Sequence, residues 1–267
     1  MTEEEKAERR QEMLEKIKHF RLIDDTFMSK VFEESPECVQ LILHIIMNKP
    51  DLTVKKLVTQ YTLKNLQGRS ARFDVYAEDS TGKKYNIEIQ RANKGAGARR
   101  ARYNLSLMDA NSLISGEETE QLPETYVIFI TENDVLGLGE PLYIIERTIL
   151  GKDKKFNDGS HIIYVNSACR EGDSPLALLM QDFFCAEPDK MNYKLLAERI
   201  SYFKHDETGV SKMCQIMDDL MKKDNHRQAR EIANRMLLRG KYTYEEIAED
   251  SGLPLEEVME LAGQKTA

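Results

Sequence analysis

Apolar residues recur at helical spacing toward both ends of the chain. Residues 2–18 have a helical composition, and residues 20–32 and 36–47 place apolar side chains three and four positions apart. From residue 174 onward the pattern is helical again, with a long and highly charged stretch at residues 209–238. The pattern predicts two helices before the first strand of the central region and an α-helical region after it.

The central region follows the two-residue period of β-strands instead. Residues 53–62 are rich in β-branched side chains, and residues 71–78 and 84–90 alternate strictly between apolar and polar positions. The four residues between the alternating segments, Asp79-Ser80-Thr81-Gly82, are typical of a turn. These two segments therefore predict a β-hairpin.

A helix and two apolar strands complete the predicted core. The helix covers residues 98–114, and the strands cover residues 126–131 and 161–165. Residues 133–159 connect these two strands and contain much of the glycine of the chain. The predicted order of the core is α-α-β-β-β-α-β-β.

The predicted hairpin carries two carboxylates on one face. If residues 79–83 form its loop, Asp74 lies directly opposite Glu88, with Cβ atoms about 5 Å apart. Two carboxylates that close repel each other, and a divalent cation with oxygen ligands is the simplest group to lie between them. Such a cation lowers the pKa of a bound water and stabilises charge on a phosphate oxygen. Gln90, on the same face, can hydrogen-bond to the attacking water or to the phosphate. An ordinary exposed polar face is the alternative interpretation of this pattern.

Basic residues surround this hairpin although the chain is acidic overall. The 267 residues carry a formal net charge of −8, whereas residues 83–102 hold seven basic residues and one acid, Glu88. Lysine and arginine bind nucleic acids by releasing counterions from phosphates, although a solvated charged face would look similar. We expect phosphate or DNA contacts from the residues that follow the hairpin: Arg91, Lys94, Arg99, Arg100, Arg102 and Tyr103.

Other features of the composition exclude several classes of protein. Residues 1–18 are charged throughout and contain neither a signal-peptide core nor the apolar run of about 20 residues that spans a bilayer. We therefore expect a cytoplasmic protein without membrane association. The cysteines are scattered and predict neither a zinc site nor a disulfide framework: Cys38, Cys169, Cys185 and Cys214.

The residues of the hairpin resemble the motif of the PD-(D/E)XK phosphodiesterase superfamily. The similar segments are Phe73-Asp74-Val75 and Asn86-Ile87-Glu88-Ile89-Gln90-Arg91. In that superfamily an Asp and a Glu-x-Lys on adjacent strands bind the metal. The recombination-promoting nuclease (Rpn) and transposase family within it has Gln in place of Lys. Four further stretches resemble that family, and together they cover roughly residues 20–170: residues 22–32, 100–103, 122–131 and 141–143.

The resemblance implies a three-layer α/β fold with a mixed central sheet and DNA as the substrate. It also implies a metal, Mg²⁺ or alternatively Mn²⁺, that is held by Asp74, Glu88 and the backbone carbonyl of Ile89. An acid on the first helix often completes such sites. Asp24 is the matching position because Phe27 follows three residues later, while the adjacent Asp25 remains open. Capping of a helix N-terminus is an alternative role for Asp24.

Two positions depart from the superfamily motif. Phe73 stands where the name of the superfamily has Pro, and Gln90 stands in place of Lys. The second departure leaves the group that activates water open, because a carboxamide supplies neither charge nor a base at neutral pH.

The sequence predicts four segments along the chain. They are a charged N-terminal helix (1–20), a PD-(D/E)XK nuclease-like domain (21–190), a charged helical region (191–238) and a helix-turn-helix-like segment (239–267). In residues 241–262 the single basic residue Lys241 faces seven acids. Since helices that read DNA normally bring Arg or Lys to phosphates and bases, a protein contact such as homo-oligomerisation is the better prediction for this last segment.

The leading prediction of function is a metal-dependent DNA endonuclease linked to recombination or mobile elements. The alternative is a catalytically inactive DNA-binding or protein-interaction module on a nuclease scaffold, which Gln90 in place of Lys would favour. The pair Asp74 and Glu88 favours the enzyme. In a protein without catalytic function, accumulated mutations would be expected to remove one of two carboxylates that repel each other.

Overall fold

The computed structural model describes residues 2–65 and 68–263. Met1 and residues 264–267, at the outer ends of the predicted segments 1–20 and 239–267, lie outside the described residues. The chain forms two compact units. The α/β unit contains Lys18–Lys204, and the helical unit contains Met1–Ile17 and His205–Ala267.

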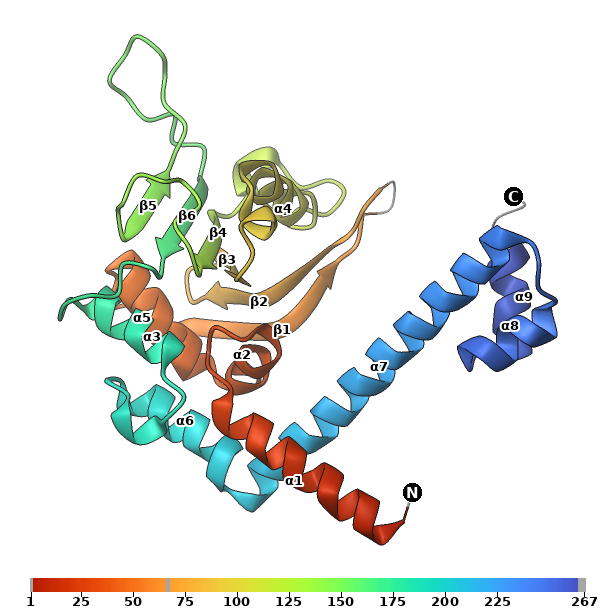
Figure 1. Cartoon of the computed structure of the whole chain (residues 1–267). Coiled ribbons are helices and arrows are strands. Elements are labelled where there is room, and N and C mark those ends of the chain that lie inside the picture. The colour runs from red at the N-terminus through yellow and green to blue at the C-terminus, as the bar shows by residue number, and fades with distance from the viewer. Residues whose placement is uncertain (1, 66–67, 264–267) are drawn as a thin grey trace. The chain divides into compact units, whose positions relative to one another are not determined.

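A mixed sheet of six strands forms the centre of the α/β unit within the described part of the chain (Figure 1). The strands lie in the order β1-β2-β3-β4-β6-β5. The pairs β3–β4 and β4–β6 are parallel, and the other neighbours are antiparallel. The strand bounds are as follows: β1 (Val54–Leu63), β2 (Ala71–Asp79), β3 (Lys84–Gln90), β4 (Thr125–Thr131), β5 (Leu142–Ile145) and β6 (Ser160–Asn166).

Helices cover both faces of this sheet, which gives three layers. Helix α4 lies on one face, and α2, α3 and α5 lie on the other (Figure 1). The predicted α/β class with a mixed sheet is thereby confirmed. The elements that complete this unit are as follows: α2 (Asp25–Phe32), α3 (Pro36–Met47), η1 (Asn93–Ala96), α4 (Ala98–Ala110), η2 (Thr119–Gln121), α5 (Pro175–Phe184), η3 (Pro188–Lys190) and α6 (Lys194–His205).

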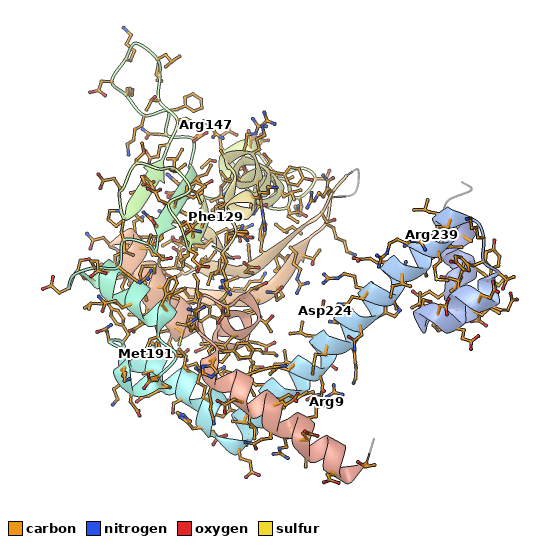
Figure 2. The ribbon with its side chains drawn as sticks, in the orientation of Figure 1. Arg9, Phe129, Arg147, Met191, Asp224 and Arg239 are labelled. Atoms are coloured by element: carbon orange, nitrogen blue, oxygen red, sulfur yellow. The ribbon has the colours of Figure 1, made fainter. Side chains whose placement is uncertain are left out.

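The core lies where β4 meets α4. Every residue of β4 is buried, as expected for a parallel strand in the middle of a sheet. Helix α4 buries Ala101, Leu105 and Met108, spaced four and three residues apart, in a cluster with Val127 and Phe129 of β4. Figure 2 shows Phe129 in the interior of the unit. This packing fixes α4 beside the hairpin that carries the candidate chemistry.

The sequence missed one strand. Strand β5 has four residues and pairs with β6 at the edge of the sheet, within residues 133–159, which the sequence predicted as a connection. It shows no alternating pattern because Ile144 and Ile145 are both exposed and only Tyr143 is buried. The hydroxyl of Tyr143 donates to the carboxylate of Asp134, and the strand is defined by its pairing with β6 rather than by an alternating pattern.

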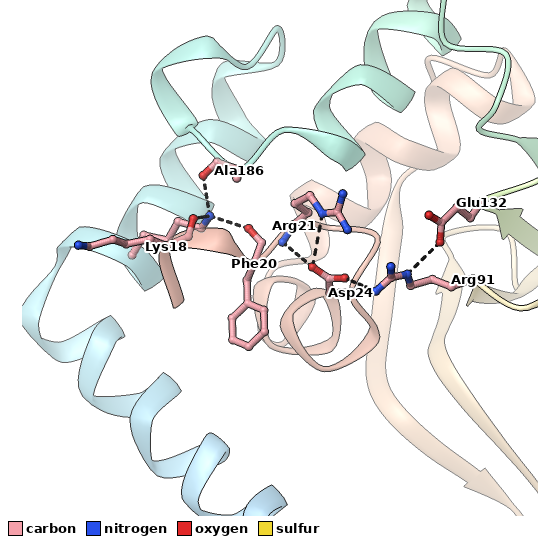
Figure 3. A network of polar contacts seen from close by, with 8 residues as sticks. Lys18, Phe20, Arg21, Asp24, Arg91, Glu132 and Ala186 are labelled. Atoms are coloured by element: carbon pink, nitrogen blue, oxygen red, sulfur yellow. Dashed lines mark hydrogen bonds and ion pairs between the residues drawn. The ribbon is translucent and has the colours of Figure 1, made fainter. Parts of the chain in front are cut away.

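A buried lysine joins α6 to the beginning of the α/β unit. The Nζ of Lys204 donates hydrogen bonds to the carbonyls of Lys18, Phe20 and Ala186, at 2.9, 2.6 and 2.6 Å (Figure 3). Burial lowers the pKa of this ammonium group to about 8. Three carbonyl acceptors satisfy all three of its donors, so Lys204 fixes the entry of the chain into α2.

The helical unit consists of α1 (Glu3–His19), α7 (Glu207–Arg239), α8 (Tyr244–Ser251) and α9 (Leu255–Gly263). The predicted pair of short C-terminal helices is present, with Gly252 between them in the left-handed conformation that glycine favours. Both helices pack on the end of α7, and the shared core is made of apolar residues of all three: Ala233, Met236, Ile247, Leu253, Val258 and Leu261. No helix of the described residues has the length and apolar character needed to cross a membrane.

Candidate active site

The turn of the hairpin sets the register on which the site depends. Oδ1 of Asp79 accepts hydrogen bonds from the backbone N–H groups of Thr81 and Lys83, at 2.8 and 3.1 Å. Beyond this turn Tyr76 pairs with Asn86, and the next pair is Val75 with Ile87. Continuing the register by one residue brings Asp74 opposite Glu88, as the alternating pattern predicted.

Both carboxylates are removed from solvent. Asp74 is 8% exposed and Glu88 is fully buried. Oδ2 of Asp74 accepts a hydrogen bond of 3.0 Å from the backbone N–H of Ile89, on the neighbouring strand. This bond fixes the carboxyl group of Asp74 against β3, next to the backbone of the Glu88–Ile89 step.

The electrostatic environment disfavours two negative charges at this place. Burial is the largest cause that raises the pKa of Asp74 to about 6, and the charge of Asp25 raises it further. Burial and then the charge of Asp74 raise the pKa of Glu88 to about 8. Perturbed carboxyl groups of this kind cluster at functional sites, because a cation can supply the charge that the protein withholds.

Helix α4 supplies a positively charged side chain that contacts Glu88. The guanidinium of Arg100 donates from Nη2 to Oε2 of Glu88 at 2.6 Å and from Nη1 to the carbonyl of Gly95 at 3.1 Å. Asn104, one turn further along α4, lies 3.5 Å from Oε1 of the same carboxylate. Arg100 therefore lowers the cost of burying Glu88, and it does so from the helix rather than from the strand.

The side chain of Gln90 lies against the backbone of η1. A Cβ atom at Gly95 would overlap Oε1 of Gln90 and would lie 2.7 Å from its Cδ. Glycine is therefore required for this approach, since any larger residue would push the carboxamide away. Because Gly95 has no side chain, its Cα leaves room for Gln90, and its carbonyl accepts a hydrogen bond from Arg100.

Strand β1 has an irregular residue opposite Asp74. Gln60 has a φ of 53°, and the pairing between β1 and β2 passes from Thr59–Val75 to Tyr61–Phe73 without it. The side chain of Gln60 donates to Oδ1 of Asp25 at 3.3 Å. Backbone strain of this kind concentrates at functional sites. No sequence pattern singled out Gln60, because glutamine carries no local signal for a left-handed backbone.

A family comparison agrees with this geometry. A family model for "PD-(D/E)XK nuclease family transposase" matches residues 27–168, which is more than half of the chain. The chain belongs to this family. The match includes all six strands and α4, and hence Asp74, Glu88 and Arg100. Neither the curated proteins nor the solved structures gave a match.

The two acids at the start of α2, which precede the matched residues, have different partners. Asp25 influences the pKa of both Asp74 and Glu88, and it is held by Gln60. Asp24, the position that the sequence matched to the family, instead accepts a hydrogen bond from Nη1 of Arg91 at 2.9 Å (Figure 3).

Asp24 has a structural role at this place. Its Oδ2 accepts a hydrogen bond of 2.9 Å from the backbone N–H of Arg21 (Figure 3). Asp24 occupies the N-cap position of α2, but its side chain makes no capping hydrogen bond. The capping role that the sequence left open is therefore not formed.

The basic residues predicted to contact phosphate divide into separate groups. Arg91 is paired with Asp24 and, through Nε, with Glu132 at 2.9 Å (Figure 3). Lys94, Arg99 and Arg102 are exposed, and their side chains have no polar partner among the described residues. The structure thus brings only Arg100 of this set to the buried carboxylates, within residues 2–65 and 68–263.

Tyr103 lies apart from the carboxylates. Its hydroxyl donates to the carbonyl of Arg69 and accepts a hydrogen bond of 3.2 Å from Asn65. Both partners belong to the connection between β1 and β2, so Tyr103 braces that connection rather than a phosphate.

The donor set at the family motif suits a hard divalent cation. Asp74 and Glu88 provide carboxylate oxygens from adjacent strands, Asp25 adds charge nearby, and oxygen ligands are those that Mg²⁺ and Mn²⁺ prefer. The carboxamide of Asn86, two residues before Glu88, is fully buried, and its contact with Glu88 lowers the pKa of that carboxyl group. No three acidic, histidine or cysteine side chains of those residues are already arranged around one point. Two carboxylates and a backbone carbonyl would leave the remaining positions of such a cation to water.

Proposed function

We propose that the chain is a metal-dependent endonuclease that hydrolyses phosphodiester bonds of DNA, in recombination or the movement of mobile elements. The observation that carries the proposal is the pair of buried carboxyl groups, Asp74 and Glu88, at the motif positions of a PD-(D/E)XK nuclease transposase domain. Membership of this family supports a nuclease or transposase-related role, and the raised pKa of both groups supports a site that needs a cation.

Three groups would hold the metal in this proposal. Asp74 and Glu88 are the carboxylate ligands, and the carbonyl of Ile89 is the backbone ligand, while Asp25 adds negative charge from the start of α2. When bound, Mg²⁺ or Mn²⁺ lowers the pKa of a water and stabilises negative charge on the phosphate. The hydrogen bond from the N–H of Ile89 to Asp74 keeps one carboxylate oriented toward this place.

Arg100 supplies the positive charge that Gln90 lacks. Most members of the superfamily place a lysine at the position of Gln90, whereas here the guanidinium of Arg100 reaches Glu88 from α4. An arginine can stabilise the charge that develops on a phosphate in the transition state. The carboxamide of Gln90, fixed against Gly95, is then left to orient water by hydrogen bonds.

A second candidate function is an inactive DNA-binding or protein-interaction module. The ion pair of Arg100 with Glu88 favours it, because this contact already neutralises one carboxylate without a metal. Self-association through the C-terminal helices also remains a proposal. Most apolar residues of α8 and α9 are buried on α7, so a second copy would have to use exposed residues such as Leu238 and Met259.

Incubation with supercoiled plasmid separates these functions. The purified chain should nick or linearise the plasmid in Mg²⁺ or Mn²⁺ and not in EDTA, and Glu88→Gln should lose this activity while keeping its circular dichroism spectrum. Plasmid that stays supercoiled under all metal conditions would favour the inactive module. Equal cleavage by wild type and Glu88→Gln would place the activity elsewhere.

A further inference from the structure

A groove runs between α4 and the base of the β5–β6 connection. It lies on the α/β unit and has a volume of about 290 Å³. Figure 2 shows Arg147 where this connection leaves the sheet. The residues that determine the character of the groove are three arginines and three aliphatic residues: Arg99, Arg102, Arg147, Leu105, Ile145 and Ile162.

Two of the arginines present free charge to the groove. The side chains of Arg99 and Arg102 are exposed, and neither has a hydrogen-bond or ion-pair partner among the described residues. Arg147 is paired with Asp158 and is therefore neutralised within the connection.

The acid in the wall of the groove is also neutralised. Glu146 is paired with Lys155 at 2.5 Å, and it lies 3.4 Å from Nδ1 of His161. The unpaired charges in the groove are then those of Arg99 and Arg102. They are positive, so the groove complements an anionic ligand.

The floor of the groove is apolar. Ile145 and Ile162 are paired in the register of β5 and β6, so their side chains are neighbours, and Leu105 faces them from α4. The connection that continues from this floor exposes Leu150 and Phe156, which are 94% and 61% exposed. Proteins that bind single strands combine a positively charged groove with side chains that contact the faces of the bases. In this groove the charges are guanidinium groups and the apolar side chains are aliphatic.

The groove is distinct from the site at Glu88. On a helix with 3.6 residues per turn, Arg100 points about 100° away from Arg99 and about 160° away from Arg102. Arg100 reaches Glu88, whereas Arg99 and Arg102 line the groove. Helix α4 therefore presents one arginine side chain to the proposed active site and two arginine side chains to a separate surface of the same unit.

We propose that this groove binds a single strand of DNA, with phosphates on Arg99 and Arg102 and a base against Ile145 and Ile162. The choice of DNA rests on the proposed function, whereas the preference for one strand rests on the groove. Bases stacked and paired inside a duplex cannot reach an apolar floor, so a duplex would use the arginines alone. The chain is then a nuclease whose α/β unit also holds an unpaired strand, on a surface separate from the proposed active site.

The test is the binding of a fluorescein-labelled oligomer of 20 deoxythymidines, measured by anisotropy in EDTA at several salt concentrations. A 20-base-pair duplex is the comparison probe. The variant is Arg99→Gln with Arg102→Gln, and the matched control is Arg227→Gln with Arg239→Gln, which removes two exposed arginines from α7. EDTA removes cleavage from the measurement, so an inactive enzyme would not affect the result.

The expected result is at least a tenfold weaker binding of the single strand by the groove variant and unchanged binding by the control. The salt dependence should become shallower by about 1.4 in slope, because each phosphate contact on a single strand contributes roughly 0.7. An equal loss on the duplex and the single strand would overturn the preference for one strand. Wild-type binding by the groove variant, or an equal loss in the control, would overturn the site itself.

Discussion

The carboxamide of Gln90 rests on the one residue of η1 that leaves room for it, Gly95. A Cβ atom there would overlap Oε1 of Gln90, while the carbonyl of the same glycine accepts a hydrogen bond from Arg100. Gly95 thus contacts both side chains that we propose take the role of the lysine in the superfamily motif.

Replacement of this glycine should act through Gln90. Gly95→Ala should change the free energy of unfolding by less than about 1 kcal/mol, because the atoms in the way are the end of a flexible side chain. It should nevertheless lower cleavage about tenfold or more by displacing the carboxamide. Gln90→Ala should cause a similar loss, and the double variant should be no worse than either single one. Additive losses in plasmid cleavage would show that Gly95 acts independently of Gln90.

Arg100 should control both the rate of DNA cleavage and the dependence of that rate on pH. Arg100→Gln removes the charge that lowers the pKa of Glu88, so the pKa of that carboxyl should rise and the ascending limb of the cleavage profile should move to higher pH. The maximal rate should fall about 10²-fold or more, as when one preorganised donor is lost. Arg102→Gln removes the same charge from the same helix without contacting Glu88. The profile of that control should stay at the wild-type pH, and a shift in both variants would contradict the assignment.

The two adjacent acids of α2 should behave differently. Asp25→Asn should weaken the binding of Mn²⁺ about tenfold or more and lower cleavage, because this carboxylate contributes charge to Asp74 and Glu88. Asp24→Asn removes an ion pair with an Arg91 that is half exposed, so stability should fall by less than about 1 kcal/mol and metal affinity should be unchanged. Metal binding that depends on Asp24 and not on Asp25 would reverse this assignment.

The metal-free protein should lose stability as the pH rises. The pKa values of Asp74 and Glu88 are raised in the fold from 3.8 and 4.5 to about 6 and about 8, so the folded state binds more protons than the unfolded state in this range. The stability contributed by the protonated groups is present below pH 4 and is lost between about pH 4 and 8. Over this pH range the Tm of Glu88→Gln should fall by a few degrees less than the Tm of wild type. A loss of 1 kcal/mol in the free energy of unfolding corresponds to roughly 2–4 °C in Tm for a protein of this size. Mg²⁺ at pH 8 should raise the Tm of wild type and not of the variant. Parallel Tm curves for the two proteins would contradict the raised pKa of Glu88.

Much of the fold and the centre of the site follow from local patterns. Strict alternation and the turn residues before Lys83 were enough to predict the hairpin and its register, in which Tyr76 pairs with Asn86 and Val75 with Ile87, because the turn and the alternating pattern set that register. The continuous apolar run of β4 was equally informative, since a buried parallel strand needs no further context.

The rest of the site depends on tertiary packing. The sequence grouped Arg100 with its basic neighbours, and only the rotation of α4 on the sheet separates it from Arg99 and Arg102. The left-handed backbone of Gln60 lies inside strand β1, where no local pattern predicts it. Asp24 and Asp25 are neighbours in sequence, and the start of α2 directs them to different partners.

The measurement that tests the centre of the proposal most directly is a calorimetric titration of Mn²⁺ into the chain at neutral pH. Wild type should bind the ion saturably, and Asp74→Asn and Glu88→Gln should each abolish this binding without unfolding, as judged by circular dichroism. Asp224→Asn, which removes an exposed acid of α7, should bind as wild type does. Undiminished binding by Asp74→Asn and Glu88→Gln would contradict the conclusion that these two carboxylates hold the metal.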